Sequence, residues 1–237
     1  MLFNTSIKTI FNDYFIKRLR CTVIGEGMLH EGNIYLIDYA LKNMPKNGAT
    51  FEIGVYGGLS TNLILYLKFK NNIISEHYGC DAWVYEGYND CLAKKESYID
   101  GRNDISRTDY MNYIKSAFIN ATNFLHPNNL PYVAHFRSDD FFEKWNKNEI
   151  FIDVFERSFF VNKNISFAYI DGDHSFEQTK KDFENVDAKL NLNGFVLIDD
   201  SAKKSNFGSA KYVSEILKNP NYKYIDRNPN YLFQKIK

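Results

Sequence analysis

The stretch ISFAYIDGDHSFEQTKKDFENVDAKLNLNGFVLIDDS, residues 165–201, has an alternating pattern of strand, helix and strand. Its apolar runs at 165–170 and 194–199 have the length and near-continuous hydrophobicity of buried strands. The segment between them has apolar residues at the spacing of one helix face. These residues are Phe176, Phe183, Val186 and Leu190. Such a unit predicts two parallel strands in a sheet that is covered by helices.

The same alternation continues on both sides of this stretch. Three further strands are predicted at 49–55, 77–83 and 132–136, with helical patterns after the first and the third. At the end of the chain, two strand patterns flank the turn signal RNPN at 227–230, which predicts an antiparallel hairpin at the sheet edge. The sequence therefore predicts a doubly wound α/β fold with a mostly parallel sheet and helices on both faces.

Two segments do not follow this alternation. Residues 1–45 are predicted to form an N-terminal helical cap, because Ile7, Ile10, Phe11 and Phe15 have helical spacing. Residues 46–237 would then form the main domain. A polar segment at about 84–130 is predicted to be an insertion, with a helix over 109–125. A connection of this length inside a compact domain usually has a function, such as covering a substrate.

Composition excludes several classes of protein. The 237 residues contain 29 Lys and Arg and 29 Asp and Glu, so no net charge attracts the chain to nucleic acid or an anionic membrane. No apolar run reaches the roughly 18 residues that span a bilayer. Cys21, Cys80 and Cys91 lack the spacing of a zinc site and are expected to be free thiols in a reducing compartment. A soluble cytoplasmic protein is expected.

A glycine-rich loop follows the first predicted strand in FEIGVYGGLST, residues 51–61. It lacks the Gly-Lys-Ser/Thr of a phosphate loop and the G-x-G-x-x-G of a dinucleotide site. A nucleoside without a pyrophosphate fits better, with the carboxylate of Asp81 at the end of the second strand accepting hydrogen bonds from the ribose. The alternative is a tight turn beside a solvated Asp81.

Acidic residues end the strands of the opening stretch. Asp171 follows one strand, and Asp199 and Asp200 end the next. Because ligands of such sheets bind across the carboxyl ends of the strands, the three carboxylates are predicted to converge beside the glycine loop. Carboxylates that converge repel one another unless a cation lies between them, and oxygen ligands favour Mg²⁺. The alternative is that DGDHS and DDS are ordinary turns and helix caps.

These motifs together resemble class I S-adenosylmethionine-dependent methyltransferases, which have a Rossmann-like fold. The pair IDGDHSF and GFVLIDD is similar to that of metal-dependent small-molecule O-methyltransferases, including the macrocin-type sugar enzymes. The resemblance covers about residues 45 to 237 and is strongest at 51–61 and 167–201. It implies that the methionine part of the cofactor lies near Glu52 and Gly54, with the ribose at Asp81. The adenine would lie at Ser138 with Asp139 or Asp140, and the alternative is that one of these two residues caps the next helix. The candidate cofactor-binding residues are Glu52, Gly54, Gly58, Ser60, Asp81, Ser138 and Asp139.

The resemblance also implies a reaction. Asp171, Asp199 and Asp200 are the candidate Mg²⁺ ligands. Asp173 or His174 would take the proton from an acceptor hydroxyl, and Asp173 is slightly favoured for a sugar substrate. The expected acceptor is a hydroxylated small molecule, a sugar or glycoside rather than a catechol. The N-terminal helices are also candidates for forming a homo-oligomer.

Two other functions compete with this interpretation. A nicotinamide-dependent oxidoreductase could use the same kind of sheet, but the G-x-G-x-x-G pattern is missing. A non-catalytic cofactor-binding subunit would keep the glycine loop and would not need the three acidic residues.

Overall fold

The computed structural model describes residues 8, 13, 16, 29–84 and 104–237. The predicted apolar positions at 7, 10, 11 and 15, and residues 21 and 91, lie outside this part of the chain. The helices are α2 (Glu31–Asn43), α3 (Leu59–Lys70), α4 (Arg107–Leu125), α5 (Ser138–Asn146), α6 (Phe176–Asp187) and α7 (Gly208–Ile216). The strands are β1 (Ala49–Ile53), β2 (His77–Asp81), β3 (Tyr132–His135), β4 (Phe151–Ile152), β5 (Ser158–Phe159), β6 (Ile165–Ile170), β7 (Leu190–Ile198), β8 (Tyr222–Arg227) and β9 (Tyr231–Lys235).

Seven of these strands form one sheet in the order β3-β2-β1-β6-β7-β9-β8. The strands β3, β2, β1, β6 and β7 are parallel to one another, and β9 is antiparallel to both β7 and β8. The strand order reverses between β1 and β6, so the carboxyl ends of these two strands flank the point where such sheets bind ligands. The predicted doubly wound sheet with an antiparallel terminal hairpin is confirmed.

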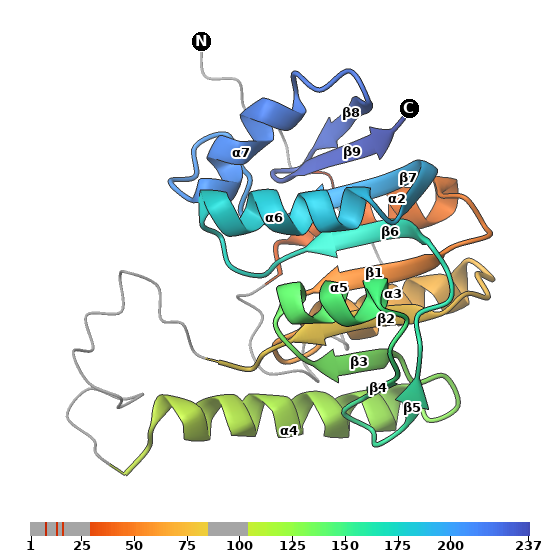
Figure 1. Cartoon of the computed structure of the whole chain (residues 1–237), viewed down its shortest axis with the longest axis vertical. Coiled ribbons are helices and arrows are strands. Elements are labelled where there is room, and N and C mark those ends of the chain that lie inside the picture. The colour runs from red at the N-terminus through yellow and green to blue at the C-terminus, as the bar shows by residue number, and fades with distance from the viewer. Residues whose placement is uncertain (1–7, 9–12, 14–15, 17–28, 85–103) are drawn as a thin grey trace.

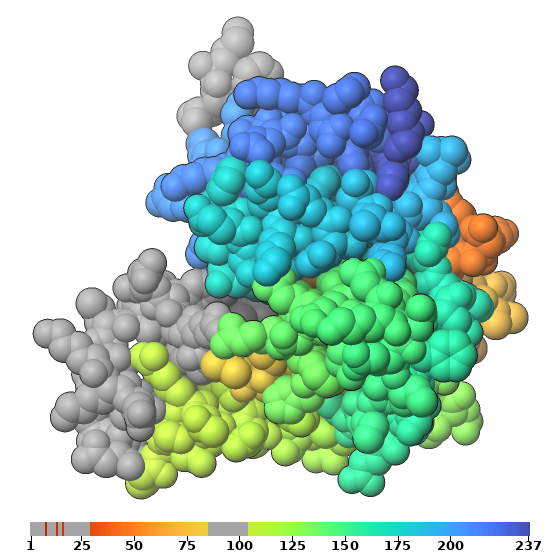
Figure 2. All heavy atoms as spheres, in the orientation of Figure 1, coloured from red at the N-terminus to blue at the C-terminus, as the bar shows by residue number. Residues whose placement is uncertain are grey.

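Helices cover both faces of the sheet (Figure 1). On one face, α5, α6 and α7 pack against a core that includes Phe51, Phe141 and Phe183. Atoms of these helices cover that face in the space-filling view (Figure 2). On the other face, α2 and α3 pack against a second core that includes Leu36 and Phe167. The sheet is thus the middle of three layers.

Alternation along the strands decides which layer each acidic residue faces. Side chains of successive strand residues point to opposite faces. Ile170 belongs to the core under α5, α6 and α7, whereas Tyr169 and Leu197 belong to the core under α2 and α3. Continuing this alternation by two residues puts Asp171 and Asp199 on the α2 side. The helix α2 and the side chains of Asp171 and Asp199 therefore lie on the same face of the sheet.

The long segment after β2 contains the predicted helix, now α4. A capping box at Ser106 and Asp109 defines its start. Phe118 of α4 is fully buried and packs beside Val55 and Trp83 in a third cluster. Residues 85–103 lie outside the described part of the chain. The division into a cap and a main domain stays a prediction, although α2 packs directly against α3.

Several element boundaries differ from the predictions. For example, β1 ends at Ile53 rather than at residue 55, and α4 begins at Arg107 rather than at residue 109. The helix predicted to run to Leu190 ends at Asp187, and β7 begins at Leu190 rather than at residue 194. Leu190 is buried in the core either way, so its hydrophobicity could not separate the two assignments. The strand predicted to reach Trp83 ends at Asp81, because Trp83 has a positive φ of 44°. The two-residue strands β4 and β5 were not predicted, since each is too short to show alternation.

Within the described residues, no helix has both the length and the apolar character needed to cross a membrane.

Candidate active site

The glycine loop connects β1 to α3 and fits tightly against its surroundings. Gly54 has a φ of +83°, and a Cβ added to it would lie 1.9 Å from the backbone oxygen of Asp171. Gly58 caps α3 with a φ of +84°, and a Cβ there would lie 2.3 Å from the ring of Phe118. Both positions require glycine, for conformation and for space. Gly54 thereby holds the end of β1 against the end of β6.

Asp81 supports this loop from the end of β2. Its Oδ2 accepts hydrogen bonds from the backbone N–H groups of Val55 at 2.8 Å and Tyr56 at 2.7 Å. Its Oδ1 accepts one from Trp83 at 2.6 Å. Burial raises the pKa of Asp81, and the three backbone donors oppose that rise. The carboxylate predicted to contact a ribose thus also fixes the loop, which makes it more than a solvated strand end.

Glu52 lies beneath the loop rather than on its surface. Its side chain is fully buried on the α3 side of β1 and accepts a hydrogen bond from the hydroxyl of Thr61. The Nε2 atom of His77 lies 3.5 Å from Glu52 Oε2. Burial lowers the pKa of His77, and Glu52 opposes that change. Ser60, the residue before Thr61, is buried in the first turn of α3.

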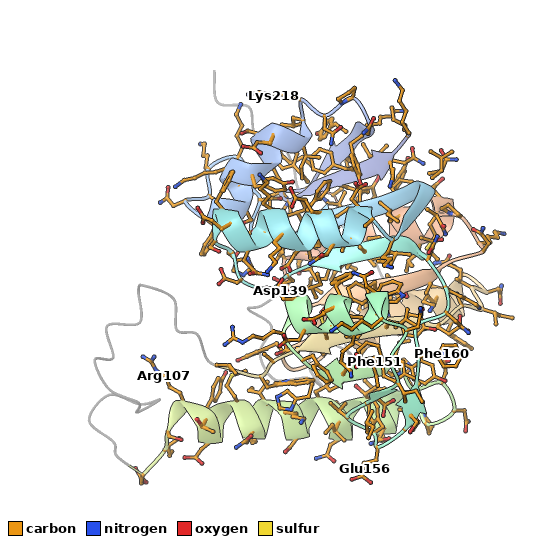
Figure 3. All side chains as sticks on the ribbon, viewed as in Figure 1. Arg107, Asp139, Phe151, Glu156, Phe160 and Lys218 are labelled. Atoms are coloured by element: carbon orange, nitrogen blue, oxygen red, sulfur yellow. The ribbon has the colours of Figure 1, made fainter. Side chains whose placement is uncertain are left out.

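Ser138 and Asp139, predicted to lie at the adenine, form the first turn of α5 (Figure 3). The side-chain amide of Gln178 in α6 donates to Ser138 Oγ at 3.2 Å and to Asp182 Oδ1 at 3.0 Å. Burial raises the pKa of Asp182 to about 6. Asp139 forms an ion pair with Lys181 at 2.5 Å. The contacts of Gln178 and Asp182 with this turn were not predicted, because only the tertiary packing of α5 on α6 creates them.

The acidic strand ends come together as predicted. Asp171 and Asp199 lie close enough that, beyond the effect of burial, the charge of Asp199 raises the pKa of Asp171. His174 places its Nε2 atom 3.8 Å from Asp171 Oδ1 and 3.5 Å from Asp200 Oδ2. Asp200 has a φ of 49°, an uncommon conformation for a residue other than glycine. Four candidate residues therefore form one cluster at the carboxyl ends of β6 and β7.

The electrostatics of this cluster reflect crowded negative charge. Burial raises the pKa of Asp171 well above its ordinary value, and the charges of Asp199 and Asp200 raise it further. Burial and Asp199 likewise raise the pKa of Asp200, whereas His174 lowers it. A cation at this position would relieve the repulsion.

Asp173 lies apart from this cluster. Its side chain is exposed, and its Oδ1 accepts a hydrogen bond at 2.6 Å from the backbone N–H of Ser175, the residue that caps α6. His174 is largely buried, with 10% of its side chain exposed. The two candidate bases thus differ clearly in their surroundings.

Two residues that sequence reasoning missed contact the cluster. The side-chain amides of Asn33 in α2 and Asn230 in the β8–β9 turn both donate to Asp199. Asn33 lies in no recognisable motif and Asn230 only in the turn signal RNPN, and no local signal could have linked positions so far apart in the chain. Their amides nevertheless satisfy a buried carboxylate that would otherwise lack donors.

The acidic cluster offers oxygen donors for a cation, although the described residues form no preformed coordination sphere. Among the residues that the structure describes, no group of three or more His, Cys, Asp or Glu side chains is arranged to hold a metal ion. The donors themselves are three carboxylates, two of which, Asp171 and Asp200, have raised pKa values, and they match a hard divalent cation in charge and atom type.

Comparison with known protein families identifies the fold and the class of enzyme. A family model described as "Methyltransferase domain" matches residues 51–201, which contain the glycine loop and both acidic strand ends. The chain belongs to this methyltransferase family. The predicted methyltransferase is thus confirmed, and the oxidoreductase alternative is not favoured. A comparison with curated protein sequences finds no match.

Solved structures agree with this assignment at the level of the fold. An O-methyltransferase from Bacillus cereus in complex with SAH has a TM-score of 0.58 and 11% identity, covering 96% of this chain and 93% of the other. The O-methyltransferase NovP has a TM-score of 0.51 and 15% identity, covering 86% and 80%. CalS11, described as a TDP-rhamnose 3'-O-methyltransferase of calicheamicin biosynthesis, has a TM-score of 0.51 and 12% identity, covering 96% and 97%.

Proposed function

We propose that this methyltransferase uses S-adenosylmethionine to methylate a hydroxyl group of a small molecule, and that this molecule is a sugar or glycoside. One observation supports this proposal above others. Asp171, Asp199, Asp200 and His174 converge at the ends of β6 and β7, while Gly54 holds the glycine loop against the backbone of Asp171. A cofactor at the loop and an acceptor at the acidic cluster would therefore be neighbours.

The proposed cofactor site runs along the loop and the adjacent strand ends. Gly54 and Gly58 shape the loop through their positive φ angles and their close contacts with Asp171 and Phe118, and Ser60 lies in the helix turn that follows. Asp81 would contact the ribose, and Glu52 would support the loop from below. Ser138 and Asp139 would lie at the adenine. Bound methyltransferase structures with this fold, such as the Bacillus cereus enzyme with SAH, support the choice of cofactor.

Asp171, Asp199 and Asp200 would hold a Mg²⁺ ion. This part of the proposal rests on the charge and donor type of the carboxylates rather than on a preformed coordination sphere. When bound, the ion would supply positive charge that favours ionisation of a nearby hydroxyl, and S-adenosylmethionine would supply an activated methyl group.

The protein's own residues would orient the acceptor and remove its proton. Asp173 or His174 would take the hydroxyl proton while the oxygen bonds to the methyl carbon and the carbon–sulfur bond breaks. The main contribution of the site would be to hold the two reacting atoms at close distance. The fold neighbours NovP and CalS11 are described as O-methyltransferases, which supports transfer to oxygen.

The protein is expected to act in a reducing, cytoplasmic environment. The described cysteine, Cys80, is a buried free thiol, and burial raises its pKa well above the ordinary value, which keeps the thiol unreactive. The balance of 29 basic and 29 acidic residues gives no general attraction to nucleic acid. A homo-oligomer formed through the N-terminal helices remains part of the proposal.

Calorimetry with S-adenosylhomocysteine and with NAD tests the cofactor directly. We expect S-adenosylhomocysteine to bind and NAD not to bind, and tight binding of NAD alone would refute the proposal. A methyl-transfer assay over hydroxylated sugars, glycosides and catechols would then identify the acceptor class. Turnover that is unchanged in a chelator would exclude the ion while leaving methyl transfer intact.

A further inference from the structure

Asp199 is held by two buried amides that come from opposite ends of the chain. Asn33 Nδ2 in α2 donates to Asp199 Oδ1 at 2.5 Å, and Asn230 Nδ2 in the β8–β9 turn donates to the same oxygen. All three side chains are buried, with exposed fractions of 0% for Asn33, 3% for Asn230 and 5% for Asp199. Neither amide contacts Oδ2, the second oxygen of the carboxylate.

The orientation of both amides is determined by the hydrogen bonds around them. Asn230 Nδ2 also donates to Asn33 Oδ1 at 3.1 Å, and Asn33 Nδ2 also approaches the hydroxyl of Tyr169 at 3.3 Å. Reversing the amide of Asn33 would place its oxygen against the carboxylate and its N–H₂ against another donor. The network therefore permits one arrangement, with both N–H₂ groups directed at Asp199.

The two backbone segments that carry these amides, α2 and the β8–β9 turn, are in direct contact. Asn228 Nδ2 donates to the carbonyl of Gly32 at 3.2 Å. A Cβ added to Gly32 would lie 1.8 Å from the carbonyl oxygen of Asn228, so α2 and the turn are in direct backbone contact. Since Gly32 precedes Asn33 and Asn228 lies two residues before Asn230, this contact sets the distance between the two amides.

We propose that Asn33 and Asn230 are positioning residues that hold Asp199 Oδ1 and so direct Oδ2 toward a bound cation. The inference rests on the proposed function, in which Asp199 is a Mg²⁺ ligand. Buried donors that orient a ligating carboxylate commonly contribute 10-fold to about 100-fold to metal affinity. Both residues lie outside residues 51–201, the range of the family match. The N-terminal helix and the terminal hairpin are thereby part of the site.

Calorimetric titration of the full-length protein with Mg²⁺, in the presence of S-adenosylhomocysteine, tests this inference. The variants Asn33→Leu and Asn230→Leu keep the volume of the side chain and remove its donors. We expect each to lower Mg²⁺ affinity by about 10-fold to 100-fold without changing the affinity for S-adenosylhomocysteine. Asn43→Ala is a matched control in the same helix, because the exposed Asn43 side chain donates only to the Tyr39 carbonyl.

Thermal unfolding separates positioning from simple structural support. If a folded variant melts at a lower temperature but binds Mg²⁺ as wild type does, the positioning role is refuted. Should a leucine variant not fold, Asn33→Ser and Asn230→Ser are measured in the same way. Asp199→Asn serves as the reference for loss of the ligand. If wild type itself binds S-adenosylhomocysteine but no Mg²⁺, the ion is refuted and the inference falls with it, whereas methyl transfer does not.

Discussion

At Gly54 the end of β1 contacts the end of β6. A substitution at this residue therefore tests the link between the glycine loop and the acidic cluster. A Cβ at Gly54 would lie 1.9 Å from the Asp171 carbonyl oxygen, and its φ of +83° disfavours any side chain. We predict that Gly54→Ala lowers the affinity for S-adenosylhomocysteine at least about 10-fold, equivalent to about 1.4 kcal/mol. Isothermal calorimetry measures this change.

Gly79 in β2 provides the control for this substitution. A Cβ at Gly79 would meet its nearest neighbours at 3.4 Å, an ordinary contact, and its φ is not positive. Gly79→Ala should therefore leave cofactor affinity close to that of wild type. Equal affinities for the two alanine variants would show that the close approach of Gly54 to Asp171 does not shape the cofactor site.

The identity of the proton acceptor is a second question at the residue scale. His174 lies within the acidic cluster, whereas Asp173 is exposed and uses one oxygen to bond the N–H of Ser175. We predict that one of the variants Asp173→Asn and His174→Gln lowers kcat by about 10²-fold to 10⁴-fold, as expected for loss of a general base. Steady-state kinetics with a saturating acceptor would identify it. Two variants with wild-type kcat would exclude both residues.

At the scale of elements, α4 packs against the glycine loop and supports its position. Phe118 is fully buried, lies against the position of Gly58 and is 5.9 Å from the ring of Trp83. Truncating a buried phenylalanine typically costs about 3–5 kcal/mol. We predict that Phe118→Ala lowers the free energy of unfolding by about this amount and also weakens cofactor binding, as measured by denaturant titration and calorimetry.

Phe124, near the end of the same helix, is the matched control. It is 78% exposed, so Phe124→Ala should change the free energy of unfolding little. If the two substitutions proved equally mild, α4 would not support the loop.

The last turn of α3 contains a buried lysine that makes stability depend on pH. Lys68 is 1% exposed and donates to the carbonyls of Ser75 at 2.6 Å and Glu76 at 3.1 Å. Burial lowers the pKa of Lys68 from 10.5 to about 7. Between these two values the unfolded chain binds more protons than the folded one, so stability rises with pH.

This linkage predicts the behaviour of Lys68→Met. The measured quantity is the free energy of unfolding of wild type minus that of the variant. This difference should be constant below pH 7 and should rise between about pH 7 and pH 10.5, at up to about 1.4 kcal/mol per pH unit. Urea titrations at several pH values measure the difference. Lys70→Met, an exposed position in the same helix end, should show no such slope. A difference that falls with pH would contradict the assignment.

Elements with a clear hydrophobic pattern in the sequence were predictable, and those fixed by tertiary contacts were not. The strand ending at Ile170 could be predicted from its near-continuous apolar run, and the helix beginning at Phe176 from its helical spacing of apolar residues. The boundary at Leu190 could not, since that residue is buried under either assignment. The convergence of Asp171 with Asp199 followed from the rule for strand ends, because it depends only on strand order and direction.

At the scale of the whole molecule, the site joins segments that are distant in sequence. Asn33 and Asn230 are 197 positions apart, yet their side chains are 3.1 Å apart at Asp199. No periodicity or motif in either segment signals this meeting, because it arises only when α2 packs against one face of the sheet whose edge the terminal hairpin forms. The meeting of the acidic residues was thus predictable from the strand ends, and the contacts of Asn33 and Asn230 with Asp199 were not.

The concentrated negative charge of the site leads to a prediction for the stability of the whole protein. A ligand that binds only the folded state stabilises it by about 2.7 kcal/mol at about 100 times its Kd. For a chain of this size, that corresponds to a rise in melting temperature of roughly 5–10 °C. We predict such a rise for wild type with Mg²⁺, reversed by a chelator, and a separate rise with S-adenosylhomocysteine.

Asp199→Ala separates these two effects in one thermal-shift experiment. The variant loses one of the three carboxylates and leaves Asn33 and Asn230 without their acceptor, so its own melting temperature is the baseline. We expect it to lose the Mg²⁺ shift and to keep the S-adenosylhomocysteine shift, because the glycine loop is unaltered. An Mg²⁺ shift that persists in the variant would place the ion elsewhere. Loss of both shifts would mean that Asp199 supports the fold of the cofactor site rather than a separate cation site.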